Sequence, residues 1–538
     1  MTRRIPRLSV AAAVAVVAGA SMAATASSAA TVHRTPGPWF KPGNLVVSRS
    51  VYSGTSSLLT PGVTQLPPGC TSGCVAANND GSYPGVFNND QVDASFGVTS
   101  PIFLDQVTPS GALVNSLAVP DGTKGGNHVV TSFSSKSEIA LNLSTSGKQL
   151  SFMGYLATPS NIDVSNSSTP TVLDPTNPVP GTDYRVVAEV DKNGRFRYTL
   201  TNSYSGNNGR AAIVNDSHGH RVIYMAGNAG NGGNPQPDGV IAGAGAQFAR
   251  ASRQAESAQT PGAPQPLGSF SITQLGDPLD KVGKDTNFRG LTISNNVIYY
   301  TKGSGGNGVN TVYFIDTTGK ACPTGVGLPQ PGAKLPTSPI AYDPTLLQTQ
   351  GVTPFNMCIL KGFPTALKTK TAFPFGLWFA NANTLYVADE GNGDATFSTT
   401  SGTFAKAAAQ TTAGLQKWVF NGTTWSLAYT ISAGLNLGTP YTVANYPTGN
   451  NPVTGLPWSP ATDGLRNITG RVNGDGTVTV WGITSTVSGN GDQGADPNEL
   501  VAVKDTLSAT SSAGESFSVI RAAGAGEVLR GVSFTPGS

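Results

Sequence analysis

The chain has 538 residues, of which 66 are glycine and 38 are proline, and only 12% are charged. This composition favours short strands and many turns over long amphipathic helices. The net charge is +3 with no cluster of basic residues beyond the N-terminus, so the electrostatic footprint of a nucleic-acid-binding protein is absent from the sequence.

The N-terminal segment, residues 1–30, has the layout of a secretory signal peptide. Arginines precede an apolar run, and small residues follow it up to Ala26 and Ala30, the two expected cleavage points. The paired arginines also resemble a twin-arginine signal, but Pro6 favours the general secretory route. No later apolar run reaches the ~18 residues of a membrane span. We therefore expect a secreted, extracellular monomer in which residues 31–538 form one domain.

The two ends of the chain each hold an incomplete sheet. Three expected strands, over 44–49, 101–107 and 113–119, have no innermost strand of their own, and the chain ends on a single strand over 529–535. A strand without partners leaves an exposed sheet edge. We therefore expect the first and last strands of the chain to pair in one sheet and close a ring.

Between these ends, an inner strand, a tight turn and a second apolar strand recur. The clearest copies cover 287–300 and 374–389, and weaker copies begin near 128, 210 and 469. Repeated four-stranded units separated by long loops are typical of a β-propeller. We predict an all-β propeller with six blades, or with seven if residues 183–200 form a blade of their own.

Four cysteines in an exported protein indicate two disulfides. Cys70 and Cys74 share a Pro/Gly-rich loop, and we predict that they pair with each other. Cys322 and Cys358 would then join the two ends of a long insertion in the fourth blade. The alternative is a metal site, but the sequence has neither Cys-x-x-Cys spacing nor a histidine near any of the four cysteines.

Two short segments resemble known propeller families. Residues 386–392, Tyr-Val-Ala-Asp-Glu-Gly-Asn, resemble the signature strand of NHL-type propellers. Residues 143–150, Leu-Ser-Thr-Ser-Gly-Lys-Gln-Leu, resemble a turn of YVTN-type, lactonase-like propellers, with Ser146 in place of the usual aspartate. The resemblance to such secreted bacterial propellers implies the fold and assigns no catalytic residue, because these families include lactonases, lyases, adhesins and scaffolds.

The residue before each inner strand should border the mouth of the central channel. In chain order these residues are His128, Arg210, Arg289, Phe375, Thr469 and Arg530. Long loops after second strands should emerge on the same face, over 227–239, 303–310, 389–394 and 488–499. Arginines and a histidine gathered there would bind carboxylate or phosphate groups. The alternative is that the arginines form structural ion pairs with acidic residues of the same loops.

Two acidic loops on that face could bind a cation, and Ca²⁺ is the ion that their oxygen ligands would suit. The candidate ligands are Asp389, Glu390 and Asp394 in one loop and Asp492, Asp496 and Glu499 in the other. Neither loop has EF-hand spacing, and acidic loops that are simply solvated are the alternative.

Two classes of function fit these features. The first is non-catalytic binding of an extracellular glycan, cell-wall polymer or protein through the loop-rich face. The second is a metal-dependent hydrolase or lyase of the lactonase-like kind, acting on an anionic substrate at the channel. The sequence has no Gly-x-Ser-x-Gly motif, and His218 and His220 fall in a turn expected on the opposite face. This thin set of acid–base residues favours binding and leaves catalysis open.

Overall fold

The computed structural model describes residues 38–91, 96–122, 129–134, 139–173, 177, 179–219, 221–228, 245–251, 287–303, 308–322, 325–337, 357–366, 371–490 and 494–538. The expected signal peptide, with Ala26 and Ala30, lies outside these ranges, as do His128, His220 and Asp492. Within the described ranges, no helix has the length and apolar character needed to cross a membrane.

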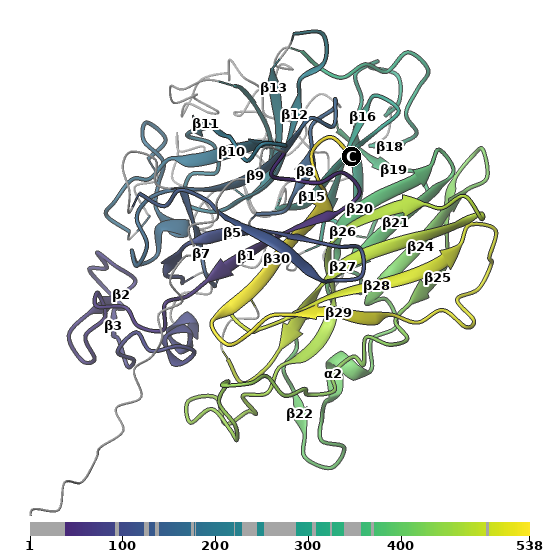
Figure 1. The fold of residues 1–538 in the computed structure, drawn as a ribbon. Helices are drawn as coiled ribbons and strands as arrows, with labels where there is room; N and C mark the ends of the chain where they lie inside the picture. The colour runs from purple at the N-terminus through teal and green to yellow at the C-terminus, as the bar shows by residue number, and fades with distance from the viewer. Residues whose placement is uncertain are drawn as a thin grey trace, which may run out of the picture. The chain divides into compact units, whose positions relative to one another are not determined.

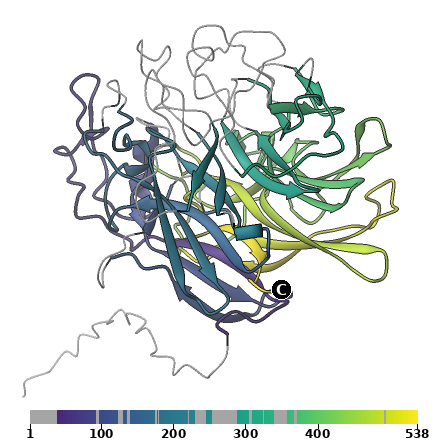
Figure 2. The ribbon, with the colours of Figure 1, turned by 90° about the horizontal axis from the view of Figure 1, so that it is seen from above.

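The first and last strands of the described chain share a sheet, as predicted. Strand β30 (Glu527–Phe534) pairs antiparallel with β1 (Leu45–Val51), and Val532 lies opposite Val47. Strand β1 then pairs with β5, and β5 pairs with β6. Figures 1 and 2 show the yellow C-terminal strand beside the purple N-terminal one. One blade is thus built from both ends of the chain, and the ring is closed.

Six blades account for the large sheets, each counted from its inner strand outward. Blade 1 is β30, β1, β5 (Ile102–Val107) and β6 (Leu113–Ala118). Blade 2 is β7 (Val129–Ser132), β9 (Gln149–Leu156), β10 (Arg185–Asp191) and β11 (Phe196–Thr201), extended by β4 (Thr99–Ser100) and β8 (Asn142–Leu143). Blade 3 is β12 (Gly209–Asn215), β13 (Val222–Gly227) and β14 (Ala246–Arg250). Residues 183–200 therefore complete blade 2, which excludes the seven-bladed alternative.

The other three blades follow the same plan. Blade 4 is β15 (Phe288–Ser294), β16 (Val297–Lys302), β17 (Thr311–Ile315), β19 (Met357–Leu360) and β18 (Val326–Gly327). Blade 5 is β20 (Pro374–Asn381), β21 (Thr384–Asp389), β24 (Gly414–Phe420) and β25 (Trp425–Ile431). Blade 6 is β26 (Ala461–Val472), β27 (Thr477–Val487), β28 (Glu499–Thr506) and β29 (Ser518–Ala522).

The connections from second to third strands carry most of the remaining elements. Between β1 and β5 lie β2 (Gln65–Leu66), β3 (Val75–Ala76) and a 3₁₀ helix, η1 (Gly85–Gln91). Between β9 and β10 lies η2 (Val164–Asn166), and between β21 and β24 lie β22 (Phe397–Ser398), β23 (Thr403–Phe404) and α2 (Ala405–Ala408). A further 3₁₀ turn, η3 (Ser217–Gly219), lies between β12 and β13. Neither of the first two connections is among the long loops predicted from the sequence.

Alternation of side chains along the strands builds the core between blades. Successive strand residues point to opposite faces of a sheet. In β16, Tyr299 packs toward blade 5, where its ring lies 4.7 Å from that of Phe379, whereas Tyr300 packs toward blade 3 with Tyr224. Both faces of each blade are therefore apolar. A buried apolar cluster of this kind lies at each of the six blade-to-blade contacts.

Glycine lets the inner strands approach one another closely. A Cβ on Gly290 in β15 would collide with the backbone oxygen of Phe375 in β20. A Cβ on Gly376 would likewise collide with the backbone oxygen of Arg466 in β26. Because these neighbours are backbone atoms, the strands would have to separate to admit a larger residue.

Both predicted disulfides are confirmed. Cys70 and Cys74 join within the connection that holds β2 and β3. Cys322 and Cys358 link the segment after β17 to β19 and so tie down the insertion in blade 4.

Candidate functional site

The inner strands carry their predicted site residues near their beginnings. Arg210 is the second residue of β12, Arg289 the second of β15 and Phe375 the second of β20. Arg530 lies within β30. All four side chains are buried. Arg210, Arg289 and Phe375 thus lie on the inner strands of the consecutive blades 3, 4 and 5, and Arg530 lies on the inner strand of blade 1.

In blade 6 the matching residue is Arg466, three positions before Thr469. The backbone oxygen of Arg466 lies against Gly376, the residue that follows Phe375 in β20. Thr469 lies farther along β26, opposite Trp481. The pairing of β26 with β27 is irregular around Arg466, where a bulge shifts the register. This irregularity is what displaces the arginine from the position expected by spacing.

Two of the arginines converge on one carboxylate. Arg289 Nη2 lies 3.7 Å from Glu390 Oε1, and Arg466 Nε lies 3.3 Å from Glu390 Oε2. Both guanidinium groups also lie over the ring of Phe375, at 5.7 Å and 5.9 Å from its centre. Glu390 comes from the loop after β21, so blades 4, 5 and 6 each contribute to the cluster. We call these four residues the arginine pair site.

The arginine pair site is largely shielded from water. The side chains of Arg289, Arg466 and Glu390 are 8%, 4% and 11% exposed. Burial lowers the pKa of Arg289; the Glu390 carboxylate opposes this shift, and the neighbouring Arg466 adds to it. The Nη2 atom of Arg466 is buried and has no hydrogen-bond partner in the part of the chain that the structure describes. Both guanidinium groups thus contact the same carboxylate, and Arg466 Nη2 is a buried donor without a partner among the described residues.

Two more carboxyl groups lie beside Glu390, and both support the loop after β21. Asp389 accepts hydrogen bonds from the backbone N–H groups of Phe373 and Gly391, at 2.8 and 3.0 Å. Burial raises the pKa of Asp389 to about 6. The two hydrogen bonds act to lower this pKa, and repulsion from Glu390 acts to raise it.

Asp463 in β26 holds the same loop from the other side. It accepts a hydrogen bond from the backbone N–H of Gly393 at 2.7 Å and another from the side-chain amide of Gln410. Burial raises the pKa of Asp463 to about 7, and repulsion from Glu390 and Asp389 contributes to the shift. The sequence alone does not indicate Asp463, because nothing in the local pattern distinguishes it from other strand residues.

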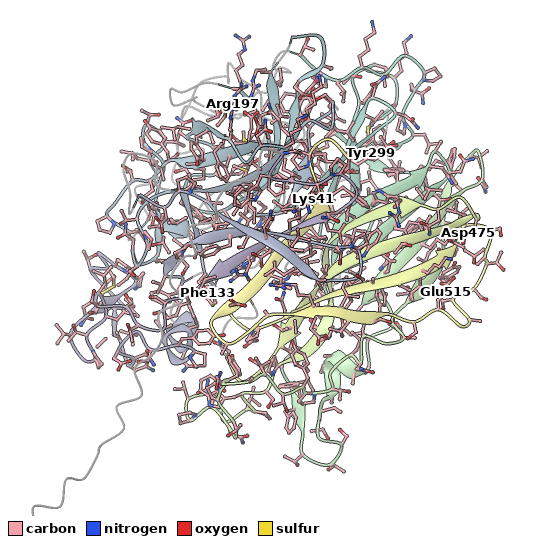
Figure 3. All side chains as sticks on the ribbon, in the orientation of Figure 1. Lys41, Phe133, Arg197, Tyr299, Asp475 and Glu515 are labelled. Carbon is pink, nitrogen blue, oxygen red and sulfur yellow. A yellow bond between two sulfur atoms is a disulfide. The ribbon has the colours of Figure 1, made fainter. Side chains whose placement is uncertain are left out.

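The other two predicted arginines make contacts with the neighbouring blade. Arg210 Nη1 donates to the backbone oxygen of Phe288 at 3.1 Å and to the side chain of Asn287. Arg530 donates from Nε to Ser50 Oγ at 3.2 Å and from Nη2 to the backbone oxygen of Phe133, a residue labelled in Figure 3. These arginines join blade 3 to blade 4 and blade 1 to blade 2, away from Glu390.

The remaining candidate cation ligands are dispersed. Asp394 is bonded to Thr396 within its own turn. Asp496 is buried and accepts hydrogen bonds from Ser488 Oγ at 2.9 Å and from the hydroxyl of Tyr446 at 2.8 Å. Burial raises the pKa of Glu499. Among the described residues, no three His, Cys, Asp or Glu side chains gather as a metal site would require. Calcium binding stays a prediction.

Arg466 could have been found from the sequence by a local signal. An arginine is followed by a small or polar residue and then an aliphatic one in Arg289-Gly290-Leu291 and Arg530-Gly531-Val532, and Arg466-Asn467-Ile468 repeats this order. Asn467 indeed takes the position next to the neighbouring inner strand, since its side-chain amide donates to the backbone oxygen of Arg530 at 2.8 Å. Aligning the repeats on this arginine-containing order, and not on strand spacing, identifies Arg466 as the residue of blade 6.

No protein-family model matches the sequence, and no curated protein sequence matches it. Among solved structures, the haemagglutinin-neuraminidase ectodomain of parainfluenza virus 5 is similar over 77% of each chain, with 11% identity and a TM-score of 0.35. A Pyrococcus horikoshii acylaminoacyl peptidase is similar over 80% of this chain and 43% of its own, with 6% identity and a TM-score of 0.27. An ulvan lyase of polysaccharide lyase family PL25 is similar over 81% of this chain and 88% of its own, with 11% identity and a TM-score of 0.26. At these values none of them indicates what this chain binds.

Proposed function

We propose that this protein is a non-catalytic, extracellular β-propeller that binds acidic glycans by a carboxylate group at the arginine pair site. The observation that supports it is that Arg466 Nη2 is buried without a hydrogen-bond partner among the described residues, in a cluster where two buried guanidinium groups contact the carboxylate of Glu390. Leaving a buried donor unsatisfied costs ~1–3 kcal/mol, so a ligand oxygen that accepts from it gains affinity. Guanidinium groups suit carboxylates because they donate two parallel hydrogen bonds.

The burial of the site limits what can enter it. With only 8%, 4% and 11% of the three charged side chains exposed, a single anionic group fits more readily than the body of a polymer. A uronic acid residue within a glycan presents such a group. The two disulfides support an extracellular setting, since disulfides persist in oxidising compartments.

The nearby carboxyl groups support binding over catalysis. Asp389 and Asp463 use their oxygens on backbone N–H groups and on Gln410, and these bonds hold the loop after β21. A general acid or base must reach the proton that it transfers. Carboxyl groups committed to the loop are poorly placed for that task.

The alternative is a hydrolase or lyase of the lactonase-like kind, with or without a metal ion. One observation favours it: a carboxyl group with a pKa of about 7, as at Asp463, can hold or release a proton at neutral pH beside a cationic site. Incubation with lactones and polyuronates tests this alternative. Turnover that Asp463→Asn or a chelator abolishes would replace the binding proposal with an enzymatic one.

Calorimetric titration with oligogalacturonate, and with a neutral oligosaccharide of equal length, tests the binding proposal. We expect the acidic ligand alone to bind, with Arg466→Gln lowering affinity at least about tenfold, as for a lost charge-assisted hydrogen bond. Arg466→Lys should retain part of the affinity, since lysine keeps the positive charge but lacks the paired N–H donors of a guanidinium group. Arg471→Gln is the matched control, because Arg471 is an exposed residue of the same strand. Equal affinity in the Arg466→Gln and Arg471→Gln variants would refute the site.

A further inference from the structure

A polar cavity lies in blade 2, at the end of the sheet where β9 begins and β10 ends. It has a volume of about 280 Å³ and is lined by Gln149, Glu189, Asp191, Arg195, Phe196 and Arg197. These residues stand where β9 begins, where β10 ends and around the turn into β11. The volume is just below the ~300–1,000 Å³ typical of ligand pockets, so it suits one small molecule or one sugar residue.

Strand register brings the polar side chains to one face. Asp191 lies opposite Gln149, and Glu189 lies opposite Arg197. Residues two apart on a strand point to the same side, so these four side chains share a face of blade 2. Phe196, which also borders the cavity, packs against the apolar core between blades 1 and 2. The cavity is therefore a polar one beside a well-packed sheet.

The acidic groups of the cavity already have partners. Glu189 is buried and forms an ion pair with Arg221, which directly precedes β13 of the next blade. Asp191 Oδ1 accepts hydrogen bonds from the backbone N–H groups of Asn193 at 2.8 Å and Arg195 at 3.0 Å, which shape the turn. Neither carboxylate forms an ion pair with the guanidinium groups of the β10–β11 turn.

The two guanidinium groups and the amide oxygen of Gln149 are available for a ligand. Arg195 and Arg197, the latter labelled in Figure 3, are exposed, and neither forms an ion pair with any described residue. Gln149 Oε1 is buried and has no hydrogen-bond partner within the described ranges. The cavity thus offers two guanidinium groups for an anion and one buried acceptor for a hydroxyl donor. A ligand that has only a charge, or only hydroxyls, would satisfy just part of this set.

We propose that this cavity is a second binding site, for an anionic sugar unit with a carboxylate or sulfate group. Arg195 and Arg197 bind the anionic group, since planar guanidinium donors match both kinds of oxyanion. Gln149 Oε1 accepts a hydrogen bond from a sugar hydroxyl and so removes the cost of an unpaired buried acceptor. This site shares no residue with the arginine pair site and does not depend on the function proposed there.

Ligand-observed NMR titration of the full chain with glucuronic acid, glucose 6-sulfate, glucose and acetate tests the proposal. The Arg466→Gln variant serves as the background, so that binding at the arginine pair site does not contribute. We expect both charged sugars to bind more tightly than glucose and acetate, and their relative affinity shows whether carboxylate or sulfate is preferred. Binding no tighter than that of glucose, or no binding by either charged sugar, would overturn the proposal.

Substitutions in the cavity separate its two parts. Arg197→Gln should weaken both charged sugars about tenfold or more, and Gln149→Leu should weaken them while leaving acetate unchanged. Arg471→Gln, an exposed arginine in blade 6, should have no effect. Because Arg197 is exposed, its loss should leave the melting temperature unchanged. Unaltered sugar binding in an Arg195→Gln/Arg197→Gln double variant with a normal melting temperature would place the ligand elsewhere.

Discussion

Lys417 in β24 and Asp505 in β28 form an ion pair between blades 5 and 6, with 3.1 Å between Nζ and Oδ2 and both side chains fully buried. Lys417 Nζ also donates to the backbone oxygen of Thr506 at 2.7 Å and to the hydroxyl of Tyr429 at 2.8 Å. Asp505 accepts hydrogen bonds from the hydroxyls of Tyr386 and Tyr429. Every charge in this contact is therefore compensated, which is the condition for a buried ion pair to be tolerated.

Removing one partner of this ion pair should therefore strongly lower the free energy of unfolding, because the other charge stays buried. Lys417→Met leaves Asp505 buried without its cation, and we expect a loss of ~3–5 kcal/mol in the free energy of unfolding, measured by urea denaturation. Adding Asp505→Asn should recover part of the lost free energy of unfolding, because the neutral amide needs no cation. Lys504→Met is the control, because Lys504 and Asp475 form a pair at 2.8 Å that is 59% and 56% exposed, and its loss should change little. Equal effects at Lys417 and Lys504 would contradict the argument.

Stability should fall as the pH rises from about 4 to about 7. Burial raises the pKa of Asp463 to about 7 and of Asp389 to about 6, and burial with a hydrogen bond to Asp505 raises that of Glu515 to about 7. A carboxyl group whose pKa is higher in the folded state binds its proton more tightly there. Its stabilising contribution is complete below its ordinary pKa and is lost as the pH passes through the raised value.

The measurement is the melting temperature at pH 5 and at pH 8. We expect a higher value at pH 5, and a smaller difference in the Asp463→Asn variant, because the amide does not titrate. A melting temperature that rises from pH 5 to pH 8 would show that other groups dominate.

The two disulfides should contribute unequally to stability. Cys322 and Cys358 are 36 residues apart, whereas Cys70 and Cys74 are 4 apart. A cross-link restricts the unfolded chain more when it closes a longer loop. We expect Cys322→Ser/Cys358→Ser to lower the free energy of unfolding by ~3–4 kcal/mol and Cys70→Ser/Cys74→Ser by less. Urea denaturation of the two variants compares them directly, and the reverse order would count against this reasoning.

Local patterns in the sequence were enough for the architecture. The unpaired strand that contains Leu529 predicted ring closure, because an edge strand needs a partner, and the paired turns and strands around Leu291 and Leu377 predicted the blades. The arginine pair site was only partly predictable. Arg289 and Phe375 follow from the repeat, but Arg466 depends on a bulge, and its convergence with Arg289 on Glu390 depends on how three blades pack.

The shared role of Glu390 allows a final test of whether Arg289 and Arg466 serve the ligand or the fold. Either single change, Arg289→Gln or Arg466→Gln, leaves Glu390 with one cation, so we expect a modest loss of stability together with weakened binding of oligogalacturonate. The double variant leaves a carboxylate that is 11% exposed without a cation. It should lose more stability than the two single variants combined, because their effects couple through one partner.

Adding Glu390→Gln to the double variant then separates the two roles. The neutral glutamine needs no cation, so the triple variant should regain much of the lost stability while oligogalacturonate binding stays absent, since the anion site has no guanidinium left. Thermal melting and calorimetric titration of the same protein samples give both quantities. If the triple variant instead recovered stability and ligand affinity together, the arginines would act only through the fold, and the glycan would bind at another surface.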